Sequence, residues 1–251
     1  MNLRKIPFLL IPVWLIIMLF MPFVEKWWGG DIFTIFISIS VLAQATVVFV
    51  SLILNTGLKS SLFIAGVIIS FTWFIEAIGA STGFPFGDYT YTDKLQPQLL
   101  GVPLLIPLAW LMMLPPSWAV ARRIAGSSSF FFFALISGLA ITAWDLFLDP
   151  QMVHWGLWTW HENGGYFGIP WINFAGWFLT AFIVTLMIRP KEIPVNLLFL
   201  VYILTWIMET AGLIIFWDLE GAALFGFLGM GFFVALSYFI YFRNQERFKQ
   251  V

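Results

Sequence analysis

The sequence has no cysteine, two histidines and few charged residues, which make up 10% of its 251 positions. Without cysteine, disulfides, thiolate catalysis and iron–sulfur clusters are excluded. The two histidines, His154 and His161, are too few for the ligand set of a membrane di-iron oxygenase. Lysines occur only at or outside the ends of the apolar runs, which excludes a retinal Schiff base within a helix. A nucleotide-binding loop, a GxSxG elbow and an HExxH motif are also missing.

Hydrophobic residues dominate instead, at 61% of the chain and a mean hydropathy of +0.94. A soluble domain carries roughly a quarter charged residues, and about 20 apolar residues cross a bilayer. The sequence therefore predicts an all-α integral membrane protein, a single polytopic domain over residues 1–251 with about eight transmembrane helices. The predicted spans are 6–23, 32–54, 60–80, 102–121, 128–148, 169–188, 193–216 and 221–242. The first span is long for a signal peptide and lacks a small-residue cleavage site, so we expect a retained helix.

Basic residues are divided unevenly between the two sides that eight spans define. Only Lys26 and Lys94 fall on the side opposite the N-terminus. The other ten fall on the side of the N-terminus: Arg4, Lys5, Lys59, Arg122, Arg123, Arg189, Lys191, Arg243, Arg247 and Lys249. The positive-inside rule thus predicts cytoplasmic N- and C-termini in a cell membrane, with the longer loops outside the cytoplasm. The net charge of −1 and the lack of a basic cluster argue against a nucleic-acid partner.

Two stretches of the sequence match each other. "GVPLLIPLAW" (101–110) and "GIPWINFAGW" (168–177) share Gly, Pro and Trp at equal spacing, 67 residues apart. Upstream correspondences, 69 residues apart, are Tyr89-x-Tyr91 with Trp158-x-Trp160, and Glu76 with Asp145. A weaker third match relates 73–79 to 206–212. Units that are two spans apart keep their orientation, so we predict a parallel internal repeat; the alternative is chance similarity in a chain rich in Trp, Gly and Pro.

Acidic residues within the spans are the first candidates for function, because a charge near the bilayer centre costs at least ~2.5 kcal/mol. Glu76, Asp145 and Glu209 lie in the outward halves of their helices, and Asp149 lies one turn beyond Asp145 on the same face. Burial among aromatic side chains favours the neutral form of a carboxyl group, which can then act as a general acid. Aromatic faces can also stabilise a nearby cation. This combination suits protonation of an alkene in a lipid-soluble substrate.

The outer loops and their flanks supply the remaining candidates. Asp88, His154 and His161 are further candidate catalytic residues. Candidate substrate-binding residues are Trp73, Phe84, Phe86, Tyr89, Tyr91, Trp110, Trp144, Trp155, Trp158, Trp160, Glu162 and Trp177. A competing interpretation is a divalent metal ion held by Asp145, Asp149, His154, His161 and Glu162. Their spacing matches no strong motif, so we expect no metal.

Each candidate could also have a purely structural role. Glu209 and Asp145 could hold helices together by hydrogen bonds, and Asp149 could simply end its helix before Pro150. Asp88 could form an Asx turn, and His161 could pair with Glu162 at the surface. The Trp and Tyr side chains could belong to a membrane-interface belt. Glu76 fits a structural role least well, because its surroundings are apolar and its counterpart is also acidic.

The segments "EAIGASTGFPFGDYTYTDKLQPQLLGVPLLIPLAW" and "AWDLFLDPQMVHWGLWTWHENGGYFGIPWINFAGW" resemble the two signature blocks of the membrane carotenoid biosynthesis protein family. That family includes bisanhydrobacterioruberin hydratase and carotenoid 1,2-hydratases. The blocks cover about 71–121 and 140–188, and the resemblance extends over roughly 71–219. It implies cofactor-independent addition of water to the terminal C1=C2 bond of an acyclic carotenoid. The partners implied are the carotenoid, water, the lipid bilayer and other carotenoid-pathway enzymes.

We expect Glu76 or Asp145 to donate the proton, and Asp149, His154 or His161 to orient or deprotonate water. Two other functions remain open at this point. A membrane carotenoid cyclase would use the same protonation step but close a ring. A non-enzymatic lipid or solute transporter would also suit parallel repeats.

Overall fold

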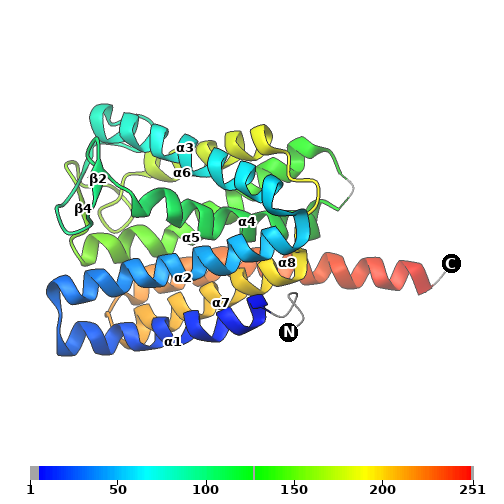
Figure 1. Cartoon of the computed structure of the whole chain (residues 1–251), viewed down its shortest axis with the longest axis horizontal. Helices are drawn as coiled ribbons and strands as arrows, with labels where there is room; N and C mark the ends of the chain where they lie inside the picture. The colour runs from blue at the N-terminus through cyan, green and yellow to red at the C-terminus, as the bar shows by residue number, and fades with distance from the viewer. Residues whose placement is uncertain (1–5, 127, 250–251) are drawn as a thin grey trace.

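The computed structural model describes residues 6–126 and 128–249, with side chains up to Arg243 (Figure 1). Within this part of the chain the helices are α1 Ile6–Trp27, α2 Gly30–Thr56, α3 Leu58–Thr82, α4 Leu105–Ala125, α5 Phe130–His154, α6 Trp171–Ile188, α7 Val195–Ile215 and α8 Glu220–Lys249. The short strands are β1 Tyr89–Tyr91, β2 Gln98–Leu99, β3 Val102–Pro103 and β4 Trp158–Trp160. The prediction of an all-α protein with eight long helices is therefore confirmed for the described residues.

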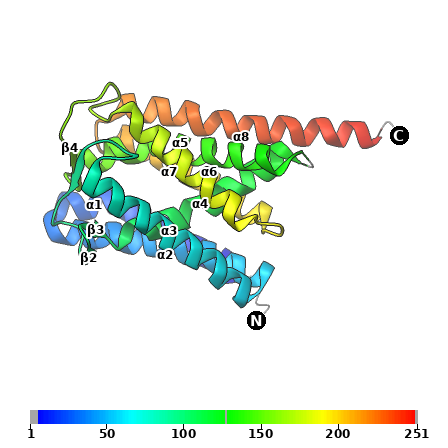
Figure 2. The same ribbon diagram turned by 90° about the horizontal axis from the view of Figure 1, so that it is seen from above.

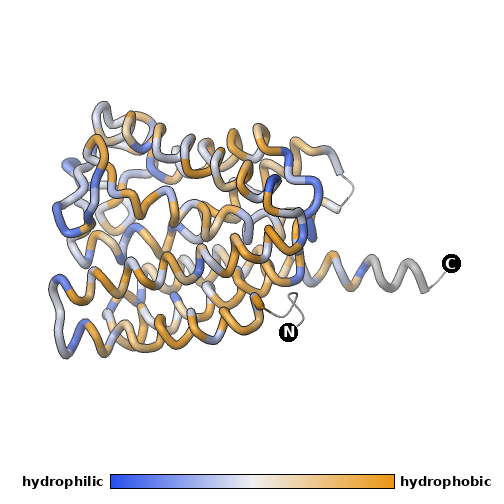
Figure 3. Tube along the Cα trace, in the orientation of Figure 1, coloured by the Kyte–Doolittle hydropathy of each residue, from blue (hydrophilic) through white to orange (hydrophobic). Residues whose placement is uncertain are grey.

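Seven of these helices are long and apolar enough to cross a membrane, which supports a multi-pass membrane protein. The eighth long helix, α4, does not meet that criterion. It is buried along almost its whole length, so its neighbours, not lipid, cover it. Many large apolar side chains on the outer faces of the other helices are exposed, and Figure 3 shows hydrophobic residues along most of the helical tube. Such faces fit contact with lipid tails.

The strands and the two longest loops lie at one end of the bundle, and α1 begins and α8 ends at the opposite end (Figures 1 and 2). This arrangement agrees with an even number of antiparallel passes. Which end faces the cytoplasm stays a prediction, because it depends on the charge bias. Arg4 and Lys5, which contribute to that bias, lie outside the described residues, as do the side chains of Arg247 and Lys249.

Segments that correspond in the two sequence blocks meet in space. Strands β1 and β4 pair antiparallel, with Tyr89 opposite Trp160 and Tyr91 opposite Trp158. Farther along the chain, the rings of Trp110 in α4 and Trp177 in α6 stack with centroids 4.0 Å apart. The two blocks therefore face each other, as halves related by a local two-fold axis would do. The duplication itself stays a prediction.

Helix α5 continues past Pro150 to His154, so the expectation that Asp149 could simply end its helix is wrong. Proline lacks an N–H group, which leaves the carbonyl of Leu146, four residues earlier, without its helical partner. The hydroxyl of Tyr166 donates to that carbonyl at 2.9 Å. Tyr166, in the loop after β4, thus stabilises the C-terminal part of α5. This helix places Asp145 and Asp149 near the strands.

Candidate active site

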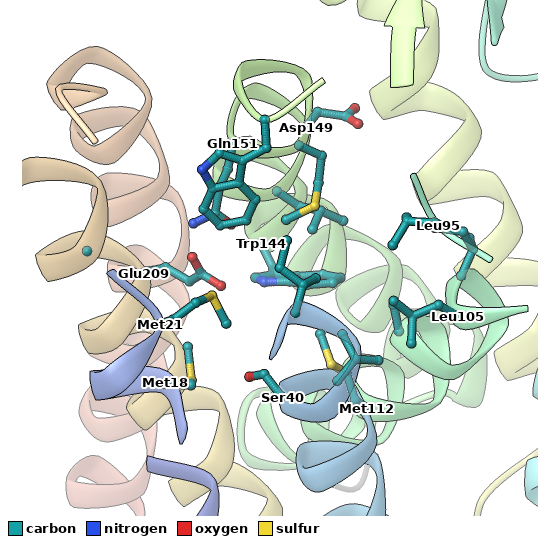
Figure 4. Close-up of a pocket in the computed structure, with 18 of the residues that line it drawn as sticks. Met18, Met21, Ser40, Leu95, Leu105, Met112, Trp144, Asp149, Gln151 and Glu209 are labelled. Atoms are coloured by element: carbon teal, nitrogen blue, oxygen red, sulfur yellow. The ribbon is translucent and has the colours of Figure 1, made fainter. Parts of the chain in front are cut away.

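A cavity of about 420 Å³ lies between helices α1 to α7 at the half of the bundle nearer the strands (Figure 4). Ligand pockets typically measure about 300–1,000 Å³. One end is lined by aromatic side chains, namely Phe86, Tyr89, Tyr91, Trp144, Trp158, Trp160 and Trp177. The other end is lined by residues of α1 and α7, including methionines. Three acidic residues reach the cavity wall: Glu76, Asp149 and Glu209.

Glu76 is buried, and three hydrogen-bond donors surround its carboxyl group. Alternation along β1 directs Tyr89 and Tyr91 to the same side, and their hydroxyls donate to Oε2 at 2.7 and 2.9 Å. The indole Nε1 of Trp110 donates to Oε1 at 3.3 Å. Burial, and next the nearby carboxyl of Glu76, raise the pKa of both tyrosines, so their hydroxyls stay protonated and able to donate.

Strand β4 positions the second carboxyl group. The indole Nε1 of Trp158 donates to Oδ1 of Asp149 at 3.1 Å. The ring of Trp158 packs edge-on against Tyr91, while Trp160 packs against Tyr89, with centroids 5.7 and 5.0 Å apart. The β1–β4 pair thus ties Glu76 of α3 to Asp149 of α5 through one aromatic layer.

Asp145 lies behind Asp149 and does not line the cavity. Its side chain is fully buried. Asn173 of α6 joins the two carboxyl groups, because its Nδ2 donates to Oδ2 of Asp145 at 2.9 Å and also to Oδ2 of Asp149. The three residues form one connected polar group within the apolar bundle.

Glu209 lies at the other end of the cavity. Gln151 of α5 also lines the cavity. Figure 4 shows Glu209 from α7 and Met21 from α1 pointing into the same space. Methionines of α1 and α7 line this end together with the aromatic residues Phe20, Phe23, Phe216 and Trp217.

Three tryptophans of the cavity wall have indole N–H groups without a hydrogen-bond partner: Trp144, Trp155 and Trp160. Oδ1 of Asp145 is buried and unpartnered as well. Buried polar groups are normally satisfied by protein or by ordered water. These groups can therefore hold water molecules inside or beside the cavity.

The candidates from the sequence divide into three sets. Those that line the cavity are Glu76, Phe86, Tyr89, Tyr91, Trp144, Asp149, Trp155, Trp158, Trp160, Trp177 and Glu209. Trp110 and Asp145 touch this set from behind, through the contacts with Glu76 and Asp149 described above. The remaining candidates lie away from the cavity: Trp73, Phe84, Asp88, His154, His161 and Glu162.

The histidines are at the surface. His154 ends α5 as an exposed residue, and the exposed side chains of His161 and Asp88 contact each other, with Nδ1 2.9 Å from Oδ1. Its Nε2 lies 2.8 Å from the hydroxyl of Thr90. The partner of His161 is thus Asp88 and not Glu162. Among the described residues, no group of three or more His, Asp or Glu side chains could hold a metal ion.

Asn173 and Gln151 are cavity residues that the sequence reasoning missed. Asn173 lies in the predicted span 169–188, and Gln151 follows Asp149 by two residues in α5. An uncharged amide in an apolar run was a usable signal, since it too requires a partner in a membrane. Only the fold shows that the partners of Asn173 are carboxyl groups.

Comparison with known proteins identifies the family. A model of the family described as "Carotenoid biosynthesis protein" matches residues 36–233. The chain belongs to the carotenoid biosynthesis protein family. The match covers both signature blocks and every helix that lines the cavity except α1, whose residues precede it.

One curated relative in this family is bisanhydrobacterioruberin hydratase of Haloarcula japonica, which is 33% identical over 120 residues. The match covers 47% of this chain and 41% of that protein, so the chain spans less than half the length of the relative. No solved structure matches the chain.

Proposed function

We propose that this protein adds water to the terminal C1=C2 double bond of an acyclic carotenoid. The observation that carries the proposal is the cavity, in which Glu76 and Asp149 lie at an aromatic end within an apolar bundle. Membership of the carotenoid biosynthesis protein family and the name of the hydratase relative support this substrate class and reaction.

The proton comes from the pair Asp145 and Asp149. Both are buried, and in the described residues no Lys or Arg side chain forms a salt bridge with them or with Glu76. Three buried carboxyl groups without a cationic partner cannot all be charged in a low dielectric. Asp149, which lines the cavity, transfers its proton to C2 and becomes a carboxylate. The bond between hydrogen and C2 forms from the alkene electron pair, which leaves a tertiary cation at C1.

Glu76 acts as the base. Its three donors, Tyr89, Tyr91 and Trp110, stabilise the carboxylate form. A water molecule attacks C1, and Glu76 accepts the proton that this water releases. The product is a tertiary alcohol, and the proton returns from Glu76 to Asp149 through water before the next cycle. Overall one water is consumed and no electrons are exchanged.

The aromatic walls stabilise the cation between these two steps. The faces of Tyr91, Trp158 and Trp160 attract positive charge, and an aromatic lining limits the number of water molecules that can reach it. The free indole N–H groups of Trp144 and Trp160 can position the water that is used. The surface residues Asp88, His154, His161 and Glu162 have no part in this scheme.

The charge bias supports an orientation in which the strands and the Glu76 end of the cavity face the outside of the cell membrane. The substrate then approaches from the bilayer, in which carotenoids dissolve. Other carotenoid-pathway enzymes would supply and consume it there.

The experiment is expression in a host that accumulates lycopene, followed by mass spectrometry of the pigments. Hydration gives a product heavier by one water. A cyclase acting through the same cation would give a product of unchanged mass. If lycopene and other acyclic carotenes are left unaltered while Glu76→Gln impairs uptake or export of a solute, the transporter alternative holds instead.

A further inference from the structure

The cavity is too small for a whole carotenoid. Cavities of about 300–1,000 Å³ enclose drug-sized ligands, and this one, at about 420 Å³, holds an end group with a short part of the chain. The rest of a rigid polyene must leave the protein through an opening. The position of that opening decides how the substrate enters.

Several residues both line the cavity and are exposed on the outer surface of the bundle. On α1 these are Leu19 and Phe20, with 56% and 53% of their surface exposed. On α7, Met208 and Ala211 line the cavity and are partly exposed. A side chain with one part in the cavity and another at the surface lies at its rim. Helices α1 and α7 therefore flank a passage from the cavity to the outer face.

Toward the strands the passage ends at Phe23 and Phe216, which also line the cavity and are exposed, and so belong to its rim. There the rings of Phe23 and Phe216 meet edge to face, with centroids 6.0 Å apart. The indole Nε1 of Trp217 donates to the carboxylate of Glu25, which joins the ends of the two helices. The other rim residues lie below this contact, in the apolar part of the helices. The opening therefore faces the depth of the hydrocarbon and not the aqueous loops.

We propose that α1 and α7 form a lateral portal, bounded by Leu19, Phe20, Met208 and Ala211, through which an apolar polyene chain extends into the bilayer while its end group occupies the cavity. This assignment rests on the proposed function for the identity of the chain. The rim is apolar, which matches a hydrocarbon chain. Glu209 and Gln151 lie just inside the portal, where a polar group of substrate or product would pass them.

The absence of cysteine provides a clean test. Ala211→Cys places a single thiol on the portal, and Ile207→Cys places one on an exposed position of α7 that does not line the cavity. Each purified, folded variant is modified with a bulky methanethiosulfonate reagent and assayed before and after reduction. The substrates are lycopene and myrcene, a short isoprenoid with the same isopropylidene end that fits entirely inside the cavity.

We expect the modified Ala211→Cys protein to lose lycopene hydration by at least about tenfold, to regain it on reduction, and to keep myrcene hydration within about twofold. The modified Ile207→Cys protein should hydrate both. If lycopene turnover of the two modified variants is equal, the portal is overturned, and it is also overturned if Ala211→Cys loses both substrates together. If the unmodified protein hydrates neither substrate, the result contradicts the proposed function itself, which distinguishes this outcome from a failure of the portal.

Discussion

Glu76 is a buried carboxyl group whose two oxygens accept three hydrogen bonds, and its substitution separates chemistry from packing. Glu76→Gln keeps the size of the side chain, and the tyrosine hydroxyls can turn to accept from the new amide. General acid–base groups contribute about 10²- to 10⁴-fold to a rate. We therefore expect hydration of lycopene to fall by about that factor, while thermal unfolding in detergent stays close to that of the unsubstituted protein.

Tyr91→Phe is the matched control for the substitution of Glu76. It removes one of the two donors to Oε2 and leaves Tyr89 in place. Loss of one such hydrogen bond costs about 1 kcal/mol, or about fivefold in rate. Equal activity of Glu76→Gln and the unsubstituted protein would remove Glu76 from the mechanism.

At the residue scale, the high free energy of a charged side chain in lipid was the signal that identified the candidate site residues. It selected Glu76 and Asp149, which line the cavity, as well as Glu209. The same argument could not tell that Asp145 lies behind Asp149, because helical spacing fixes the face of a residue but not its depth. Histidine was chosen for its chemistry alone, and the structure places both histidines at the surface.

At the element scale, the loop before β1 is held by close packing at Gly176. A Cβ atom at Gly176 of α6 would lie 2.7 Å from Phe86 and 2.8 Å from the carbonyl oxygen of Pro85. Overpacking of this kind costs about 1–3 kcal/mol, which exceeds the gain of about 0.5–1 kcal/mol from alanine in a helix. We expect Gly176→Ala to lower the unfolding temperature and, by shifting Phe86 in the cavity wall, to reduce turnover.

Gly66→Ala in α3 is the control for that substitution. Nothing lies within 4 Å of its added Cβ, so only the helix-propensity gain remains and the unfolding temperature should rise slightly. Thermal unfolding of both variants checks the opposite signs. A decrease of the same size in both would show that contact with Phe86 is not the cause.

The helices were predictable because each apolar run has the length of a bilayer crossing. Their bounds differ from the predicted spans by up to seven residues, with the largest difference at the C-terminal end of α8. The strands were not predicted. Tyr89-x-Tyr91 and Trp158-x-Trp160 were recognised as corresponding pairs, but correspondence gives no reason to expect that they pair with each other. The extension of α5 past Pro150 likewise depends on Tyr166, 20 residues away from the carbonyl it satisfies.

At the scale of the whole molecule, the orientation in the membrane is open to a direct test. Glu162 and Ser128 are exposed in loops at opposite ends of the bundle. With no native cysteine, Glu162→Cys and Ser128→Cys each carry one thiol. A membrane-impermeant maleimide is applied to spheroplasts, whose cell membrane is intact. It should label Glu162→Cys at once and Ser128→Cys only after the membrane is permeabilised. The reverse pattern would place the cavity on the cytoplasmic side.

The size of the cavity and the lateral portal together imply that a carotenoid with two identical ends is hydrated one end at a time. After the first addition the product must leave through the portal and return with its other end. During a time course with lycopene, the product with one added water should therefore accumulate beyond the amount of enzyme before the product with two appears. Adding excess unlabelled lycopene to isotopically labelled singly hydrated product should delay its second hydration, because both compete for one entrance. If the doubly hydrated product forms from the start, without release of the intermediate, both ends are reached in a single binding event, and α1 and α7 cannot be the only route to the cavity.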